Sequence, residues 1–312
     1  MSVAVVDCGT NTIRLLVAEP GDDGLVTLVR ELRYVRLGQG VDANRRFHPE
    51  ALARVFAAAD DFARLIADHE VDRTRCLATS AARDVANRDE FLDGMRQRLG
   101  VAPEIVSGEQ EARLSFLGAL AGGPTAPGPV LVSDIGGGST EIVLGDHFGR
   151  VEAARSLDIG SVRLRERCLS DDPPTPAQIT AARALVANCL DRPGGPLARL
   201  RERVDTAAPV TWIGVAGTST SIAALAAGLT VYDPAVVHNS MVAPAAIAAL
   251  SDHLLTLTAA EVGRQYPILP PLRAEVIAGG VLIAAELARR LGRPMTARET
   301  DILDGAALDT LQ

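Results

Sequence analysis

The sequence predicts an α/β protein with two domains, each built around its own sheet. Its 312 residues, of which 47% are hydrophobic and 22% charged, suffice for two medium-sized domains with hydrophobic cores. Predicted strands alternate with predicted helices after an opening β-meander. A strand, an aspartate, a glycine turn and a second strand occur in this order twice, once in each half of the chain.

Residues 3–19, VAVVDCGTNTIRLLVAE, predict a β-hairpin, because an apolar run, a polar turn at Gly9 and a second apolar run follow one another. Residues 25–36 are predicted to continue the sheet as a third strand. Apolar residues recur at helical spacing in PEALARVFAAADDFARLIADHE, which begins at Pro49. Proline suits the first position of a helix, so a long helix is expected to begin there.

Two further strands and two further helices complete the first domain. Residues 76–83, CLATSAAR, predict a buried strand that leads into a polar loop. Helices are predicted around 89–99 and from about 109 to 120, with a short strand and turn in PEIVSG between them.

Residues 121–129, AGGPTAPGP, indicate a linker, because three glycines and three prolines in nine residues disfavour a helix or strand. We therefore expect domains at 1–122 and 123–312. The last helix is expected to lie within the second part of the chain, with the option of packing back on the first domain.

The second domain opens with another predicted hairpin, LVSDIGGGSTEIVLG at 131–145. Residues 211–228 predict a strand, a glycine turn that includes Gly217, and an alanine-rich helix that begins near Thr218. A helix N-terminus of this kind binds anions through its free N–H groups and the helix dipole. An amphipathic helix is predicted over 276–291, and a last short helix in ARETDILDGAALDTL.

The two hairpins align residue by residue at the turn. Asp7 matches Asp134, Gly9 matches Gly136 and Thr12 matches Ser139, each with an offset of 127 residues (134 − 7, 136 − 9, 139 − 12). Glycine turns bind phosphate through backbone N–H groups, but a carboxylate beside the turn repels phosphate. Mg²⁺ removes this conflict, because it binds one or two carboxylates together with phosphate oxygens. Asp7 and Asp134 are therefore candidate metal ligands.

A purely structural interpretation stays open for each motif taken alone. Asp134 would then only begin a turn, and the three glycines would only permit backbone angles that other residues avoid. The repetition favours the phosphate interpretation, because unrelated turns need not agree at an aspartate, a glycine and a hydroxyl residue together.

The net charge of −8 argues against a nucleic-acid-binding protein, which needs a basic face. A compact polyanion is still a suitable substrate where positive charge is concentrated locally. All 31 basic residues are arginine, a bias that genomic composition explains as well as function does. No run of about 18 apolar residues predicts a membrane span, and no secretion signal precedes the first strand, so we expect a cytoplasmic protein.

The four cysteines, Cys8, Cys76, Cys168 and Cys189, are expected to be buried thiols. They form no CxxC pair and have no histidine at zinc-ligand spacing. The five histidines are scattered and form no HExxH motif, so none is assigned a catalytic role.

Charged side chains outside the glycine turns are candidates for the reaction itself. Glu109 and Glu111 lie in the first turn of a predicted helix, where acids commonly complement the helix dipole, and Glu109 is assigned that role. Glu111 could orient and deprotonate an attacking water if its helix points into the active site. Arg83 follows a strand and a Thr-Ser pair, which suits a phosphate clamp. An ion pair of Arg83 with Asp84 or Asp89 is equally compatible with the sequence.

Together these motifs resemble the exopolyphosphatase and guanosine pentaphosphate phosphohydrolase (Ppx/GppA) family along essentially the whole chain. DCGTNTIRLLV resembles the family's first phosphate motif, ATSAAR its arginine loop, SGEQEARLSFLG its glutamate helix and DIGGGSTEIVLG its second phosphate motif. GVAGTSTSIAAL and RETDILDGAAL stand where the family has its third glycine turn and terminal helix. The resemblance is to the short kind of member, which lacks an additional C-terminal HD-type domain.

The resemblance implies a fold of two actin-like domains of the ribonuclease H-like (ASKHA) class, flanking an active-site cleft. It implies that Glu111 activates the attacking water and that Asp7 and Asp134 are associated with the metal. The substrate-binding residues that it implies are Thr10, Asn11, Thr12, Arg83, Gly136, Gly137, Gly138, Ser139 and Glu141, with Gly217 and Thr218 in the third turn.

Two positions depart from the family pattern. The first motif reads CysGlyThrAsnThr where GlySerAsnSer-type residues are commoner, which keeps the hydroxyls but places Cys8 beside the metal site. Gln110 stands where glutamate is frequent, which removes a charge next to Glu111. Neither change removes a reacting group, so activity is expected.

The expected activity is metal-assisted hydrolysis of the terminal phosphoanhydride of inorganic polyphosphate, with Mg²⁺ or Mn²⁺ and with K⁺ as an optional activator. Hydrolysis of guanosine pentaphosphate is an alternative that uses the same reacting groups. An actin-like ATP-binding kinase, chaperone or nucleotide sensor is an alternative from another class. A homodimer is expected only by analogy. The expected lack of an HD-type domain implies a preference for shorter polyphosphates.

Overall fold

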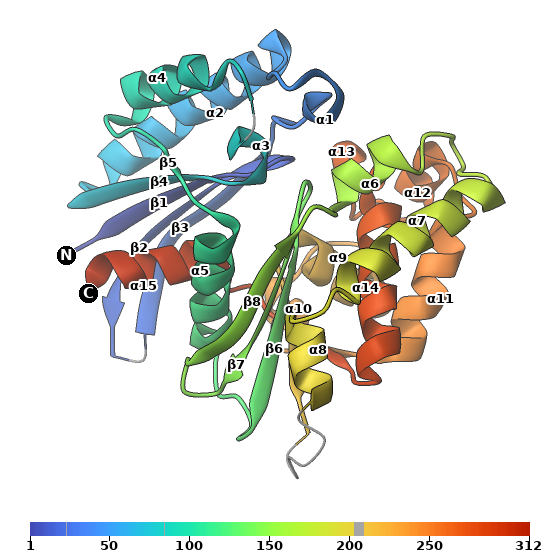
Figure 1. The fold of residues 1–312 in the computed structure, drawn as a ribbon. Helices are drawn as coiled ribbons and strands as arrows, with labels where there is room; N and C mark the ends of the chain where they lie inside the picture. Colours follow the sequence, from blue (N-terminus) through green and yellow to red (C-terminus); the bar gives the residue numbers. More distant parts are fainter. Residues whose placement is uncertain (23, 84, 203–208) are drawn as a thin grey trace. The chain divides into compact units, whose positions relative to one another are not determined.

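The computed structural model describes residues 1–22, 24–83, 85–202 and 209–312. The chain forms two compact units, which we call unit 1 (Met1–Ala121 with Asp301–Gln312) and unit 2 (Gly122–Thr300). The division expected from the sequence, 1–122 and 123–312, differs from this one mainly in the C-terminal helix, which belongs to unit 1 (Figure 1).

Unit 1 contains a five-stranded sheet with the order β3-β2-β1-β4-β5. Its strands are β1 (Val3–Cys8), β2 (Thr12–Gly21), β3 (Gly24–Tyr34), β4 (Arg73–Ala78) and β5 (Glu104–Ile105). β1 and β2 pair antiparallel, which confirms the predicted hairpin, and Asp7 lies directly opposite Arg14 in this pairing. β4 lies parallel to β1, and β5 lies parallel to β4.

Helices cover both faces of this sheet (Figure 1). They are α1 (Val41–Asn44), α2 (Pro49–Asp68), α3 (Ser80–Arg83), α4 (Arg88–Leu99), α5 (Gly108–Ala121) and α15 (Ile302–Leu311). Phe62 of α2 and Phe91 of α4 are buried in the core on one face. Leu114 of α5 and Ile302 of α15 are buried on the other. α2 begins at Pro49 as predicted.

Residues 76–83, predicted as a strand that leads into a polar loop, form the end of a strand and a short helix. β4 ends at Ala78, and Ser80–Arg83 form the short helix α3. The Thr79 carbonyl accepts a hydrogen bond from the Ala82 N–H at 3.0 Å, so the chain turns directly after the strand. Hydroxyl residues after a strand favour a helical start over further extension. Arg83 therefore lies in a helical turn and not in a loop.

α5 packs against the start of α15 through close backbone contacts at two glycines. A Cβ at Gly118 would lie 1.7 Å from the carbonyl oxygen of Asp301, and a Cβ at Gly305 would lie 1.9 Å from that of Leu114. Only a residue without a Cβ permits so close an approach. This packing holds α5, which carries Glu111, against the C-terminal helix.

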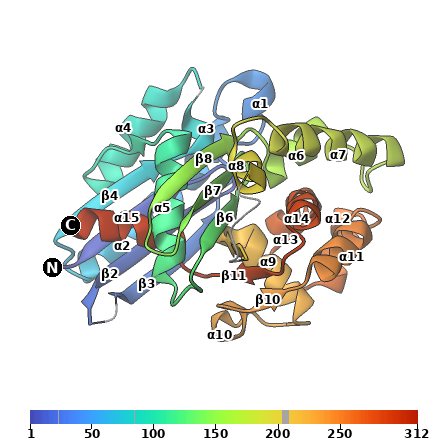
Figure 2. The same ribbon diagram turned by 60° about the horizontal axis from the view of Figure 1, so that its bottom comes forward.

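Unit 2 contains a six-stranded sheet with the order β10-β11-β9-β6-β7-β8 (Figure 2). Its strands are β6 (Pro129–Ile135), β7 (Thr140–Asp146), β8 (Val151–Leu157), β9 (Thr211–Val215), β10 (Met241–Val242) and β11 (Met295–Ala297). β6 and β7 form the second predicted hairpin. β9 lies parallel to both β6 and β11.

The helices of unit 2 are α6 (Ser161–Arg167), α7 (Pro176–Leu190), α8 (Pro196–Glu202), α9 (Ala216–Ala226), α10 (Pro234–Val237), α11 (Pro244–Leu254), α12 (Ala259–Gln265), α13 (Pro271–Ala274) and α14 (Ile277–Leu291). Of these, α9 and α14 lie where helices were predicted, whereas the sequence patterns did not predict the others. α9 and α14 contribute to a large core that also contains the fully buried Trp212. The Trp212 indole N–H donates to the Ser133 hydroxyl at 2.9 Å, which satisfies its only polar group.

The two sheets repeat a four-stranded arrangement. The order β3-β2-β1-β4 in unit 1 corresponds to β8-β7-β6-β9 in unit 2. The pairings also correspond, since two are antiparallel and the third is parallel in each. The repeat detected in the turn sequences therefore extends to the strands around them.

Three of the four cysteines are buried as predicted, namely Cys8, Cys76 and Cys189, but Cys168 is only half-buried. The Sγ atoms of Cys8 and Cys76 lie 3.9 Å apart. Among the described residues, no helix is both long and apolar enough to cross a membrane.

Candidate active site

The two glycine turns share the same backbone hydrogen bond. The Gly9 N–H donates to the Thr12 carbonyl at 2.9 Å, and the Gly136 N–H donates to the Ser139 carbonyl at 3.0 Å. A Cβ at either glycine would lie 3.2 Å from that carbonyl oxygen. The equivalence inferred from the sequence is thus confirmed in the geometry of the turns.

The first turn directs peptide N–H groups to one side. The Thr10 carbonyl accepts a hydrogen bond from Gly38 at 2.8 Å, and the Asn11 carbonyl accepts from Val35 and Arg36, each at 3.0 Å. In a planar trans peptide the N–H points opposite to the C=O. The N–H groups that follow these two carbonyls therefore point away from the segment at 35–38.

Buried polar atoms without a hydrogen-bond partner gather at this turn. Within the described part of the chain they are Oδ1 of Asp7, the Thr10 hydroxyl and both polar atoms of the Asn11 side chain. All three residues are buried. Because buried polar groups are nearly always paired, such a group indicates a place where a polar ligand binds.

The other carboxylate oxygen of Asp7 is paired with Arg14. Nε and Nη2 of Arg14 donate to Oδ2 of Asp7 at 3.1 and 2.6 Å. Burial raises the pKa of Asp7, although Arg14 counteracts this effect. The candidate metal ligand of unit 1 therefore has an arginine as one countercharge and a single oxygen, Oδ1, left for a ligand.

The second turn is held by the start of α6 through its carbonyl groups. The Gly136 carbonyl accepts a hydrogen bond from Ser161 at 2.9 Å, and the Gly137 carbonyl accepts from Val162 at 2.9 Å. The Gly138 carbonyl accepts from Nε of Arg163 at 2.6 Å.

By the same peptide geometry, three successive N–H groups, of Gly137, Gly138 and Ser139, point away from α6. Successive N–H groups of this kind form a nest that binds phosphate oxygens. A Cβ at Gly160 would lie 2.5 Å from the Gly137 carbonyl oxygen, so glycine at this position permits the contact with α6.

Asp134 and Glu141 form a pair of acids in unit 2. They lie directly opposite each other in the β6–β7 hairpin, so their side chains are on the same face of the sheet. Both are buried, and the Ser156 hydroxyl donates to Glu141 at 2.6 Å. Two adjacent buried carboxylates repel each other unless a cation lies between them.

This donor set fits a hard divalent cation. Mg²⁺ prefers oxygen ligands and commonly takes one or two carboxylates, with water and substrate oxygens completing its shell. No group of three or more His, Cys, Asp or Glu side chains suited to a metal occurs among the described residues, so an all-protein metal cage is not present there. The pair of acids suits a metal ion whose remaining ligands are water molecules and oxygens of a phosphate substrate.

Glu111 and Arg83 are brought together in unit 1. Nη2 of Arg83 forms a short hydrogen-bonded ion pair with Oε2 of Glu111, and Nε of Arg83 donates to the Val106 carbonyl at 3.1 Å. Glu111 is only 7% exposed although it lies in the first turn of a helix. Of the two partners weighed for Arg83, Asp84 lies outside the described residues. The structure pairs Arg83 with Glu111.

The residues beside Glu111 have structural roles. Glu109 is exposed, as expected for an acid that complements the helix dipole. The Gln110 N–H donates to the Ser107 hydroxyl at 3.2 Å, and the Ser107 N–H donates to the Gln110 side chain at 2.9 Å. This is a capping box, and it explains how glutamine is accommodated where glutamate is frequent.

The third glycine turn differs from the other two. The hydroxyl of Thr218 donates to the Ile135 carbonyl at 2.7 Å, so this predicted substrate-binding side chain is engaged by β6. A Cβ at Gly217 would lie 2.2 Å from Nη2 of Arg273, which shows that the guanidinium lies directly on the turn. Arg273 is only 8% exposed.

The predicted residues thus fall into two sets, one in each unit. Unit 1 holds Asp7, Thr10, Asn11, Thr12, Arg83 and Glu111; unit 2 holds Asp134, Gly136, Gly137, Gly138, Ser139, Glu141, Gly217 and Thr218. Three arginines beside the turns, namely Arg14, Arg163 and Arg273, were not predicted from the sequence motifs. Hairpin register alone places Arg14 opposite Asp7, so that arginine was available from the sequence, whereas no local signal marks the other two.

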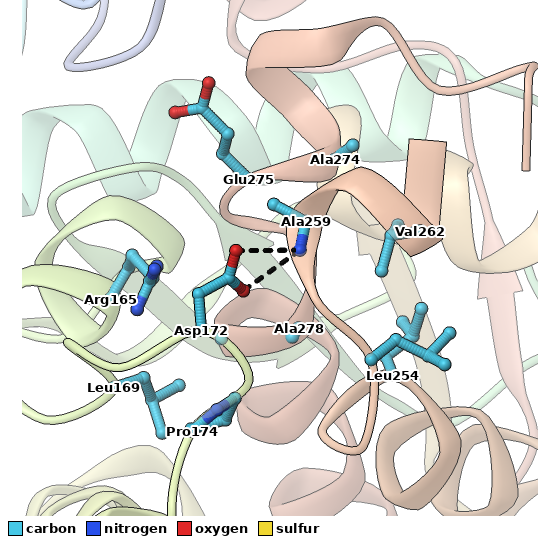
Figure 3. A pocket seen from close by; sticks show the side chains of 12 residues that line it. Arg165, Leu169, Asp172, Pro174, Leu254, Ala259, Val262, Ala274, Glu275 and Ala278 are labelled. Atoms are coloured by element: carbon cyan, nitrogen blue, oxygen red, sulfur yellow. Dashed lines mark hydrogen bonds between the residues drawn. The ribbon is translucent and has the colours of Figure 1, made fainter. Parts of the chain in front are cut away.

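A small pocket elsewhere in unit 2 is separate from these residues. Figure 3 shows Asp172 at its side, where the carboxylate accepts the Ala259 N–H at 3.0 and 3.2 Å. The pocket holds about 20 Å³, enough for a water molecule. None of the predicted site residues is among those lining it.

Comparison with known proteins agrees with this geometry. The model of the Ppx/GppA phosphatase family matches residues 16–299. Exopolyphosphatase 2 of Mycobacterium tuberculosis is 46% identical over 320 aligned positions, which cover 98% of this chain and 97% of that protein.

Solved structures show the same fold. A crystal structure of an exopolyphosphatase-like protein matches with a TM-score of 0.90 and 41% identity, covering 99% of this chain and 97% of that one. The Ppx/GppA member from Aquifex aeolicus matches with a TM-score of 0.80 and 26% identity, covering 100% and 97% of the two chains. The α/β architecture of two actin-like domains is therefore confirmed, and the chain belongs to the Ppx/GppA phosphatase family.

Proposed function

We propose that this protein hydrolyses the terminal phosphoanhydride of inorganic polyphosphate and releases phosphate. The observation that carries the proposal is the group of unpartnered buried polar atoms on Asp7, Thr10 and Asn11, which suits a phosphate bound together with a cation. The identity of 46% to a protein named Exopolyphosphatase 2 supports polyphosphate as that ligand.

The glycine turns are the proposed phosphate-binding elements. In the second turn, the N–H groups of Gly137, Gly138 and Ser139 bind the equatorial oxygens of a phosphate. In the first, Thr10, Asn11 and Thr12 donate from backbone or side chain. Such preorganised donors stabilise the charge that develops on phosphoryl oxygens during transfer.

Glu111 is the proposed general base. Its carboxylate orients a water molecule and accepts its proton while the water oxygen forms a bond to the terminal phosphorus. The bond between that phosphorus and the bridging oxygen breaks, and the shortened polyphosphate leaves as an anion. Arg83 holds the Glu111 side chain in one orientation through their ion pair. Arg83 is also the candidate clamp for a phosphate oxygen.

Asp134 and Glu141 would hold a divalent cation, Mg²⁺ or Mn²⁺, and Asp7 is the candidate ligand in unit 1. When bound, such an ion neutralises charge on the transferred phosphoryl group. Three further expectations accompany this proposal: activation by K⁺, a homodimer, and a location in the cytoplasm. Light scattering tests the dimer directly.

The test is phosphate release from polyphosphates of defined length and from guanosine pentaphosphate, each with Mg²⁺, with Mn²⁺ and with chelator. We expect release from polyphosphate only with a divalent cation, and faster release from short chains than from chains of hundreds of units. Guanosine pentaphosphate has the same reacting bond, so the ratio of kcat/KM for the two substrates decides between the two activities. Absence of phosphate release from both would refute the proposal.

Glu111→Gln and Glu109→Gln form a matched pair, because both acids lie in the first turn of α5 but only Glu111 is buried against Arg83. Removing a general base lowers kcat by about 100-fold or more, so the first variant is expected to lose that much. The second should stay within about twofold of wild type. Equal rates for the two variants would exclude Glu111 as the base.

A further inference from the structure

A chain of buried charges connects the first glycine turn with the start of the C-terminal helix. Oδ2 of Asp7 accepts hydrogen bonds from Nε and Nη2 of Arg14. The remaining terminal nitrogen of Arg14, Nη1, forms a short ion pair with Oδ2 of Asp301. The side chain of Arg14 is 14% exposed and those of the two acids are 5% exposed. One guanidinium thus bridges two buried carboxylates that lie 287 and 7 residues away in sequence.

Asp301 is itself held rigidly. Its Oδ1 accepts the Leu303 N–H at 3.0 Å, so Asp301 is the N-cap of α15. Its own N–H donates to Oδ2 of Asp304 at 2.8 Å, which completes a capping box. Its carbonyl oxygen lies against Gly118 of α5, where even a Cβ would not fit. The carboxylate that contacts Arg14 is therefore anchored by two helices.

This anchoring has a consequence for Asp7. An arginine side chain has several rotatable bonds, and it is held in one conformation only where its nitrogens have fixed partners. With Nη1 fixed by Asp301, Nε and Nη2 of Arg14 both engage the same oxygen of Asp7. The other oxygen, Oδ1, is left without a partner among the described residues and is available to a ligand.

We propose that Asp301 is a positioning residue, which orients Asp7 through Arg14 so that Oδ1 of Asp7 is presented to the metal–phosphate ligand. Asp301 does not touch the ligand. The inference rests on the proposed function for its kinetic consequence, but the arrangement of Arg14 is a property of the free protein and can be measured without substrate.

The kinetic test uses Asp301→Asn. Asparagine caps a helix about as well as aspartate, so α15 should persist while the charge that holds Arg14 is removed. Loss of a residue that orients a ligand group typically costs 10–100-fold in metal affinity, so we expect the Mg²⁺ concentration for half-maximal activity to rise about tenfold. A variant of which only a smaller fraction is folded has a lower maximal activity, but it reaches half of that activity at the same Mg²⁺ concentration as wild type.

Asp304→Asn is the matched control. Asp304 lies in the same first turn of α15 and also belongs to the capping box, but its carboxylate pairs with Arg30 at 2.5 Å and not with Arg14. The control should keep the wild-type Mg²⁺ concentration even if its Tm falls. If the Mg²⁺ concentration for half-maximal activity rose equally in both variants, the effect would come from the disturbed start of α15 and not from Arg14. The proposal would then be wrong.

The substrate-free test is the NMR signal of the Arg14 Nε–H, assigned by its loss in Arg14→Lys. In wild type it should be a sharp, slowly exchanging resonance. In Asp301→Asn it should broaden or exchange at least tenfold faster, whereas in Asp304→Asn it should not. An unchanged signal in Asp301→Asn refutes the positioning role even if the enzyme is active. Absence of phosphate release together with the expected NMR change refutes the proposed function and not the arrangement.

Discussion

Asp134 lies directly opposite Glu141 in the β6–β7 hairpin. The equivalent pair in the β1–β2 hairpin is Asp7 and Arg14, an acid and a base. The repeat is therefore symmetric in its backbone but not in its charges: the hairpin of unit 1 supplies its own countercharge, and that of unit 2 has two acids. Mg²⁺ commonly binds one or two carboxylates, so the hairpin of unit 2 is a candidate cation site.

The pair of acids predicts that divalent cation stabilises the protein without substrate. Binding to the folded state at 100 times Kd adds about 2.7 kcal/mol, so Mg²⁺ should raise the Tm of wild type. Glu141→Gln should abolish most of this increase, because it removes one of the two charges. Glu152→Gln, at an exposed position of β8, is the control and should keep the increase. Differential scanning fluorimetry with Mg²⁺ and with chelator measures this increase in Tm. An equal increase in the two variants would contradict the assignment of Glu141 as a cation ligand.

The ion pair between Arg83 and Glu111 predicts a strong effect of Arg83→Lys. Lysine keeps the charge but cannot bind the Val106 carbonyl and Glu111 together, since it lacks the fork of the guanidinium. We expect kcat to fall by about 10- to 100-fold with the fold intact, because a displaced base loses much of its contribution. Arg88→Lys, at an exposed position of α4, should have no effect. Steady-state kinetics measure kcat, and circular dichroism checks the fold. Full activity of Arg83→Lys would show that Arg83 is not needed to hold Glu111 in position.

The contact at Gly118 predicts that alanine is not tolerated there. A Cβ would lie 1.7 Å from the carbonyl oxygen of Asp301, so the helices must move apart. Overpacking of this kind costs about 3 kcal/mol or more in the free energy of unfolding. Gly263→Ala, in α12, is the matched control, because its Cβ would meet only Ala274 at 4.0 Å. It should stabilise the protein by up to about 1 kcal/mol, since alanine favours a helix over glycine. Urea unfolding of both variants provides the comparison.

A surface ion network predicts a specific dependence on pH. Hydrogen bonds from Arg290, and then from Arg201, lower the pKa of Asp191 from its ordinary 3.8 to about 2. The charged form is therefore favoured in the folded state, and its contribution to stability is present above about pH 4 and is lost as the pH falls toward 2. The side chain is 41% exposed, so the effect is small.

In practice, the Tm of wild type should exceed that of Asp191→Asn by a constant amount from pH 8 to pH 5. The difference should shrink by pH 3. A difference that stays constant down to pH 3 would show that the Asp191 carboxylate has no altered pKa in the folded protein.

Local sequence signals predicted the hairpins, the turns and six helices, namely α2, α4, α5, α9, α14 and α15. The turn at Gly9 and the turn at Gly136 are defined by residues within a few positions of each other, and short-range hydrogen bonds close them. Signals of this kind are readable because backbone preferences depend on neighbouring residues. The helical turn at Ser80–Arg83 was expected to be a polar loop, because four residues are too few to show a helical period.

The sequence by itself determined the class of fold, the paired glycine turns and the family to which the chain belongs, because contiguous motifs carry all three. Only the tertiary structure decided which charges meet. Arg83 contacts Glu111, Arg273 lies on Gly217, and Arg14 contacts Asp301 across 287 residues. Such pairs depend on how helices and strands pack, and packing follows from the burial of distant apolar surfaces that no local pattern encodes.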